Sequence, residues 1–280
     1  MTVRLAALGD SITLGIGDPS PDGRWRGFAP LLAEGLGEPD HAEMLNLGVS
    51  GALSADVASE QLPRALAWRP HVATVVVGVN DTLRASFDVL SVSEHVQQIL
   101  SELSAAGTVV LTTCLPNPGR MLRLPQALAR PLARRIGAVN AILHTASRRF
   151  GAVHVHLADD PHVLDRRMWS VDRLHPSERG HRRIASLFYD ALGPTGLCHG
   201  ERPGLDPTNP PPTRFQQAKW MATKGTRWVV DRSTDLLPDL IALAASEWLI
   251  ARRDRRRSTE CQIDVATQAA LAKLQSDAIA

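Results

Sequence analysis

Short apolar runs recur along the first 160 residues, and each has the character of a buried strand. Every residue of the run Ala73-Thr74-Val75-Val76-Val77 is β-branched or apolar, as expected for a strand that is covered on both faces. Comparable runs occupy residues 3–8, 43–48, 108–113 and 153–157. This pattern predicts a sheet of five buried strands.

Helical periodicity fills the intervals between these runs. The predicted helices are 27–37, 54–68, 93–105, 130–149 and 176–192. We expect Pro63 to kink or break the second helix, Ser93 to cap the third, and Pro176 to open the fifth. Strands that alternate with helices predict a parallel sheet with helices on both faces. The fold class is therefore α/β, a three-layer α/β/α sandwich with a five-stranded parallel sheet.

The character of the chain changes after Gly193. Proline and glycine are frequent in residues 194–213, which is typical of a linker or a surface strap. Residues 235–251 have an amphipathic helical pattern that includes Trp248, and an arginine-rich run follows at 252–257. A last short helix is predicted within 262–277. We expect a domain at 1–193, a linker or strap at 194–234 and a helical extension at 235–280.

The extension has three interpretations. It packs on the domain, with its arginines complementing the helix dipole, or it forms a lid or dimer contact. Alternatively, its basic amphipathic helix contacts a membrane surface, which is the least favoured of the three. The sequence leaves the oligomeric state open.

Composition excludes several classes of protein. A net charge of +2 over 280 residues does not suggest a nucleic-acid-binding protein. The three cysteines, Cys114, Cys198 and Cys261, form neither a disulfide framework nor a zinc-ligand spacing. We see no secretory signal and no apolar run of the ~18 residues that would span a bilayer. We therefore expect a cytoplasmic protein.

Ser11 and a late Asp–His pair are the first candidates for chemistry. The run at 3–8 leads into Gly9-Asp10-Ser11, which places a hydroxyl at the carboxyl end of a strand, where open α/β sheets bind ligands. A serine needs a neighbouring base to act as a nucleophile. Asp172 and His175 are three residues apart in one predicted loop, which allows the carboxylate to orient the imidazole. The alternative is that Ser11 and Asp172 only cap helices.

Two further loops contain potential hydrogen-bond donors. The segment 46–51 contains Gly48 and Gly51, and the segment 78–81 contains Asn80. Backbone N–H groups and an uncharged amide can stabilise a developing oxyanion. Turn glycines and asparagines at strand ends are also common without any function.

These four blocks, in this order, resemble the motifs of the SGNH (GDSL) hydrolases. The resemblance covers about residues 3–193 and implies a flavodoxin-like strand order. It implies Ser11 as nucleophile, His175 as base and Asp172 as the orienting acid. It also implies an oxyanion hole made of the N–H groups of Ser11 and Gly51 and the side chain of Asn80, with Gly48 as the rival glycine. Asp10 and Asp81 belong to the motifs but are expected to brace loops.

The implied activity is that of a serine esterase that forms an acyl-enzyme on Ser11. The expected partner is a small-molecule acyl ester with a small or short acyl chain, including O-acetylated sugars or metabolites. Alternatives are acyl transfer from the same acyl-enzyme, or a non-catalytic binding protein on the same fold. No Gly-x-Ser-x-Gly elbow surrounds a serine, which disfavours an α/β-hydrolase arrangement. No cofactor is expected.

Substrate contacts and metal binding are the remaining questions. Trp25 and Trp169 lie near the motifs and are the candidates for substrate contact, Trp169 because it precedes Asp172 by three residues. A group of side chains at the end of the fifth strand could be read as a metal site: His154, His156, Asp159, Asp160 and His162. Alternating residues on a strand point to opposite faces, so we expect no metal there.

Overall fold

The computed structural model describes residues 2–37, 42–84, 86–208, 245 and 259–276. The predicted helix 235–251, apart from residue 245, lies outside these residues. The basic run 252–257 and the second half of the predicted strap, 209–234, lie outside them as well.

Five parallel strands form one sheet in the order β2-β1-β3-β4-β5. The strands are β1 (Val3–Gly9), β2 (Ala42–Asn46), β3 (Val72–Val76), β4 (Val109–Thr113) and β5 (Val153–Val155). In the central pair, Leu5 lies beside Val72 and Gly9 beside Val76. Every residue of β3 is buried, as its apolar sequence predicts. This order confirms the flavodoxin-like arrangement.

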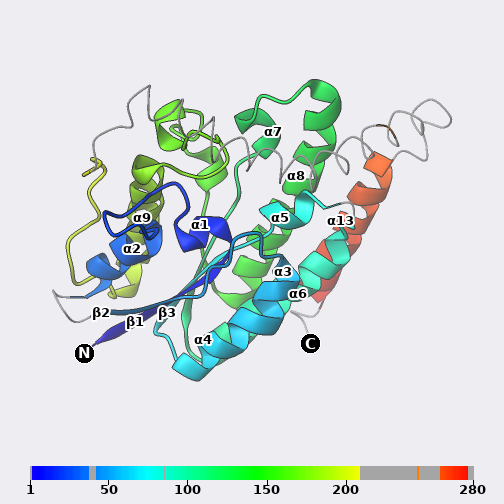
Figure 1. The fold of residues 1–280 in the computed structure, drawn as a ribbon. Coiled ribbons are helices and arrows are strands. Elements are labelled where there is room, and N and C mark those ends of the chain that lie inside the picture. Colours follow the sequence, from blue (N-terminus) through cyan, green and yellow to red (C-terminus); the bar gives the residue numbers. More distant parts are fainter. Residues whose placement is uncertain (1, 38–41, 85, 209–244, 246–258, 277–280) are drawn as a thin grey trace.

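Helices cover both faces of the sheet, as Figure 1 shows. One face is covered by α2 (Phe28–Leu36) and α9 (Glu178–Leu192), and the other by α4 (Leu62–Trp68), α6 (Val89–Ala105) and α8 (Gln126–Phe150). Short helical turns occupy the connections: α1 (Ser11–Leu14), α3 (Ser54–Asp56), a π-helical turn (Val57–Gln61), α5 (Val79–Thr82), α7 (Pro118–Met121) and 3₁₀ turns at Leu157–Asp159, Arg166–Met168 and Gly193–Thr195. The three-layer sandwich is thus confirmed.

Helix α13 (Thr259–Ser276) packs against α6 and α8 (Figure 1). Ala270 and Leu274 are each 1% exposed and join the main apolar core. Lys273 forms an ion pair with Glu94 on α6, with Nζ 3.0 Å from Oε1. This last helix is therefore part of the folded body. No helix in the described part of the chain is long and apolar enough to cross a bilayer.

Side-chain capping explains two of the predicted helix starts that are wrong. Helix α8 also begins earlier than predicted, at Gln126 rather than at residue 130. Helix α6 begins four residues before Ser93, because the Asp88 carboxylate accepts a hydrogen bond from the Leu90 N–H at 3.0 Å. Helix α9 begins after Pro176, because Ser177 is its N-cap and accepts from the Gly180 N–H at 3.3 Å. The predicted break in 54–68 is present as the π-helical turn, and Pro63 lies in the first turn of α4.

Candidate active site

Ser11 is the first residue of α1, directly after the turn that ends β1. The Asp10 side chain caps this short helix by accepting from the Ile12 N–H at 2.9 Å. Gly9 has a φ of +147°, and a side chain there would collide with the Val76 carbonyl of the neighbouring strand. Glycine is therefore required for the close turn that presents Ser11 at the carboxyl edge of the sheet.

Ser11, His175 and Asp172 form one hydrogen-bonded series. The Ser11 Oγ lies 2.9 Å from His175 Nε2, and His175 Nδ1 lies 2.7 Å from Asp172 Oδ2. The other carboxylate oxygen of Asp172 accepts from the Ser170 hydroxyl at 2.6 Å and from the N–H groups of Leu174 and His175. The Ser170–His175 loop thus holds Oδ1 of Asp172 by hydrogen bonds, and Oδ2 is left to bond the imidazole.

The electrostatics of this series keep Asp172 ionised. Burial alone would raise the pKa of Asp172, but the hydrogen bonds from His175 and Ser170 and the His175 charge outweigh it and lower the pKa to about 2. The side chains of His175 and Asp172 are each only 4% exposed. A hydroxyl, an imidazole and a carboxylate in this order can activate the hydroxyl as a nucleophile and then protonate a leaving group.

The two backbone donors that the family motifs imply are not engaged by other groups in the described part of the chain. Within the described residues, the N–H groups of Ser11 and Gly51 donate to no acceptor. The N–H of the rival glycine, Gly48, donates to Asn46 Oδ1 at 2.9 Å. The geometry therefore favours Gly51 over Gly48 as an oxyanion donor.

Asn80 lies beside the turn that carries the serine. Its amide nitrogen is 3.2 Å from Asp10 Oδ2 and 3.1 Å from the Ala52 carbonyl oxygen. These contacts engage both amide hydrogens, so an oxyanion must replace one of the two acceptors.

The two motif aspartates have structural contacts. Asp10 caps α1, and Asp81 accepts from both the N–H and the hydroxyl of Ser54. Asp81 therefore ties the loop after β3 to α3, and both residues brace loops as the sequence suggested.

A buried ionic network behind the series was not identified from the sequence. The Arg26 guanidinium bridges Asp18, with Nε 3.0 Å from Oδ2, and Glu178, with Nη2 2.6 Å from Oε1. His181 adds a hydrogen bond from its Nε2 position to the Ile16 carbonyl at 3.0 Å. These contacts fasten the segment after Ser11 to the helix after His175. No local pattern in the sequence links Arg26 to Glu178.

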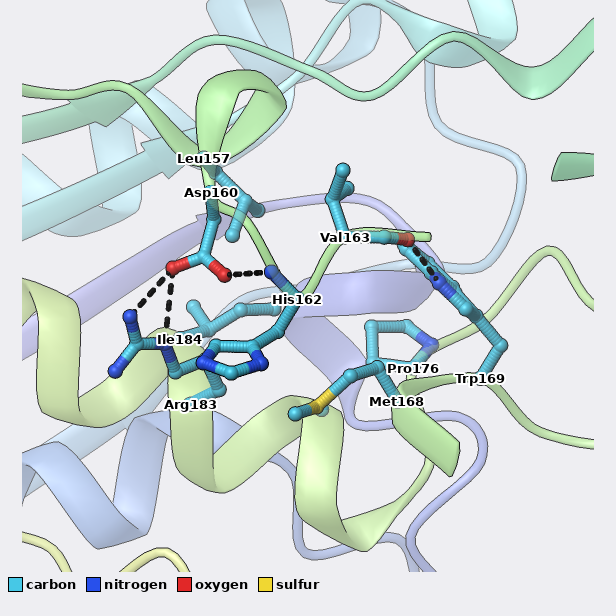
Figure 2. A pocket seen from close by; sticks show the side chains of 10 residues that line it. Leu157, Asp160, His162, Val163, Met168, Trp169, Pro176, Arg183 and Ile184 are labelled. Carbon is cyan, nitrogen blue, oxygen red and sulfur yellow. Dashed lines mark hydrogen bonds and ion pairs between the residues drawn. The ribbon is translucent and has the colours of Figure 1, made fainter. Parts of the chain in front are cut away.

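Trp169 borders the small cavity that Figure 2 shows. Its indole N–H donates to the Val163 carbonyl at 2.7 Å, and Asp160 accepts from Arg183 at 2.6 Å and from the His162 N–H at 2.7 Å. The cavity has a volume of about 20 Å³, which is room for about one water molecule. This cavity is therefore a small packing defect and is too small to hold a substrate.

A second cavity, which Trp169 also lines, has the size of a ligand site. Its volume is about 360 Å³, within the ~300–1,000 Å³ that is usual for ligand pockets. Its lining combines Trp169 with apolar residues and four arginines: Arg120, Met121, Arg123, Val163, Leu164, Arg166 and Arg173. Trp25 lines neither cavity and is 44% exposed.

The histidines at the end of β5 contradict one expectation. His154 and His156 do not face apart, because β5 ends at Val155 and the alternation stops there. Their ring centroids are 5.0 Å apart, and one ligand atom from each lies within 4.8 Å of the Cys114 thiol. Asp160 and His162 are engaged elsewhere, at the small cavity.

Comparison with known proteins adds independent information. Residues 7–183 match the model of the GDSL-like lipase/acylhydrolase family. Axe2, an acetylxylan esterase from Geobacillus stearothermophilus, is similar in fold, with a TM-score of 0.54 and 18% identity over 68% of this chain and 94% of that one. LAE5, an α/β hydrolase enzyme from the metagenome of Lake Arreo in Spain, has a TM-score of 0.51 and 21% identity over 69% and 97%. No curated protein matches the sequence.

The matched segment covers more than half of the chain and contains all four motifs. The strand order and flanking helices agree with the fold of these neighbours. This protein therefore belongs to the GDSL-like lipase/acylhydrolase family and is a carboxylic ester hydrolase.

Proposed function

We propose that this protein hydrolyses esters through an acyl-enzyme on Ser11. The 2.9 Å separation between Ser11 Oγ and His175 Nε2 carries the proposal, because it lets the imidazole take the serine proton as the hydroxyl attacks the ester carbonyl. Asp172 holds the imidazole in the required tautomer and stabilises the imidazolium that forms.

The rest of the cycle follows from the same groups. The N–H groups of Ser11 and Gly51 and the Asn80 amide stabilise the tetrahedral oxyanion. His175 then protonates the departing alcohol, which leaves the acyl group on Ser11. A water molecule, deprotonated by His175, attacks this acyl-enzyme and releases the carboxylic acid and free Ser11.

Solved variants of a structural neighbour support these roles. Three variants of Axe2 are described as catalytic mutants, and they replace a serine, an aspartate and a histidine. Axe2 acts on acetylated xylan, which agrees with a small acyl group such as acetate on a sugar or metabolite. We propose this substrate class for the present chain.

The arginine-lined cavity indicates a negative charge on the substrate. Within the described residues, Arg120, Arg123, Arg166 and Arg173 form no ion pair with a carboxylate. The pKa of Arg173 is lowered mainly by the positive charge of Arg166, and to a smaller extent by burial and by the charge of Arg123. A bound anion would relieve this mutual repulsion. Arg173 directly follows Asp172 in the chain, so we infer a carboxylate or phosphate on the ester near the reacting centre.

Initial rates on p-nitrophenyl esters from acetate to palmitate test the esterase. We expect the highest turnover on the shortest acyl chains and a loss of roughly a thousandfold or more in kcat for Ser11→Ala. Ser59→Ala, at an exposed serine, is the matched control and should behave as the wild type. Full activity in Ser11→Ala would refute the proposed nucleophile.

Paired substrates test the charge preference. The acetate ester of 4-hydroxybenzoate and the acetate ester of 4-hydroxybenzamide differ in charge, are similar in size and each contain one ester. Arg166→Gln should raise KM about tenfold for the anionic ester, which corresponds to ~1.4 kcal/mol, and leave the neutral ester unchanged. Arg167→Gln is the control, because exposed Arg167 pairs with Asp165 and does not line the cavity. Equal effects on both esters would refute the anionic substrate but not the esterase.

A further inference from the structure

One thiol and three imidazoles gather where β4 and β5 end. Cys114 directly follows β4, His154 lies in β5, His156 follows β5, and His144 lies in α8. The His144 ring centroid is 5.3 Å from that of His154 and 5.4 Å from that of His156. One ligand atom from each of Cys114, His154 and His156 lies within 4.8 Å of the other two.

A chain of hydrogen bonds fixes the tautomer of His154. The Ser147 hydroxyl donates to the Leu143 carbonyl at 2.6 Å, which uses its only hydrogen. Thr112 therefore donates to Ser147 at 2.6 Å, and the His154 Nδ1–H donates to Thr112 at 2.7 Å. This arrangement leaves the lone pair of His154 on Nε2. Metal-binding histidines are oriented by the same kind of outer hydrogen bond on their second nitrogen.

Two imidazole nitrogens in this cluster lack a protein partner. Within the described residues, His154 Nε2 and His144 Nδ1 are buried and form no hydrogen bond. Buried polar atoms are nearly always paired, and a cation bound to His154 would satisfy its Nε2.

The third feature of the cluster is the environment of the Cys114 thiol. Cys114 is 6% exposed, and its Sγ accepts a hydrogen bond from the Ala158 N–H at 3.3 Å, a contact that favours a thiolate. Burial raises the pKa of this thiol, so it stays protonated without a cation. Coordination would release the proton to solvent and form a thiolate–metal bond.

We propose that Cys114, His154 and His156 bind one borderline-soft transition-metal ion such as Zn²⁺, with His144 beside the fourth position. Sulfur and imidazole ligands suit this class of ion, and they bind it at about 2.0–2.3 Å. The three ligand atoms, which lie within 4.8 Å of one another, would therefore move closer together around the ion. Exposed His156 provides the entry path. The ion would link the ends of β4 and β5 to the segment that leads to Asp172. Its role is structural, because the Ser11–His175–Asp172 series is complete without it.

Titration with Co²⁺ tests the site directly. The full-length chain is freed of metal with a chelator, and Co²⁺ binding is followed by absorption. We expect one equivalent to produce the visible bands of tetrahedral cobalt and a thiolate-to-cobalt charge-transfer band, and Zn²⁺ to displace it. Zn²⁺ should also raise the Tm of the wild type.

Variants assign the ligands. Cys114→Ala should abolish the charge-transfer band. His156 is exposed, so His156→Ala should not impair folding. This variant should weaken binding more than tenfold and remove the Zn²⁺ effect on Tm. Thr112→Val, which removes the outer hydrogen bond to His154 together with the bond to Ser147, should weaken binding about tenfold. Cys198→Ala and His162→Ala are controls outside the cluster and should bind as the wild type. No saturable binding, or a spectrum unchanged in Cys114→Ala and His156→Ala, would overturn the proposal.

Discussion

Asp172 performs two tasks with its two oxygens, and this division explains its low pKa. Oδ1 accepts from Ser170 and two backbone N–H groups, while Oδ2 meets the imidazole. A carboxyl whose folded-state pKa falls from 3.8 to about 2 adds stability above the unfolded value, and this stability is lost as pH falls through about 2. The carboxylate therefore stays charged wherever the protein is folded and active.

Asn80 is the residue whose role can be measured most cleanly by kinetics. We expect Asn80→Ala to lower kcat by roughly 10²–10³ with little change in KM, because an oxyanion donor acts mainly in the transition state. Asn46→Ala is a suitable control, since Asn46 Nδ2 also braces a neighbouring loop, with a hydrogen bond to the Thr13 carbonyl at 2.9 Å. A raised KM with unchanged kcat would assign Asn80 to substrate binding.

At the scale of elements, the site depends on two segments that lie far apart in the chain. The segment after α1 packs against the start of α9, and Gly17, at a φ of +103°, lies so close to Pro176 that a side chain would collide with the Pro176 carbonyl. The bridge from Asp18 through Arg26 to Glu178 holds the same two segments together. The distance from Ser11 to His175 is therefore set by packing outside the series.

Gly17→Ala should disturb the active site without altering any proposed catalytic group. We expect kcat/KM to fall about tenfold or more, since misplacement of about 1 Å can cost up to a hundredfold. Gly23→Ala is a matched control, because Gly23 also has a positive φ, +83°, but a side chain there meets nothing within 4 Å. Similar losses in both variants would indicate that backbone strain alone is responsible.

The sequence predicts the elements better than it predicts their ends and partners. Apolar runs such as 73–77 locate the strands, because burial on both faces leaves few residue types. Only the family resemblance predicts the strand order, since hydrophobic periodicity does not indicate which strands are adjacent in the sheet. The convergence of His156 on His154 was missed because β5 stops one residue before His156. The Arg26–Glu178 contact joins distant segments, and no local pattern encodes it.

At the scale of the whole molecule, the end of the chain returns to the hydrolase fold. Helix α13 buries Ala270 and Leu274 against α6 and α8. Residues 194–208 also return toward the site, because Thr208 donates to Glu178 through its N–H at 2.6 Å and its hydroxyl at 2.9 Å. Parts of the chain beyond residue 193 therefore contribute packing to the domain.

Leu274→Ala tests this contribution. Removing a fully buried leucine side chain should cost about 2–5 kcal/mol of unfolding free energy, and the Tm should fall by roughly 5 °C or more. Val265→Ala on the same helix changes a side chain that is 64% exposed and should leave the Tm nearly unchanged. Equal Tm values for the two variants would show that α13 adds nothing to the stability of the domain.

The most direct test of the central claim is covalent labelling with a fluorophosphonate, read by intact and peptide mass spectrometry. The account predicts one adduct per chain, located on Ser11, and strongly reduced labelling in His175→Ala because the hydroxyl then lacks its base. Failure of the wild type to label, or an adduct on another serine, would contradict Ser11 as the nucleophile.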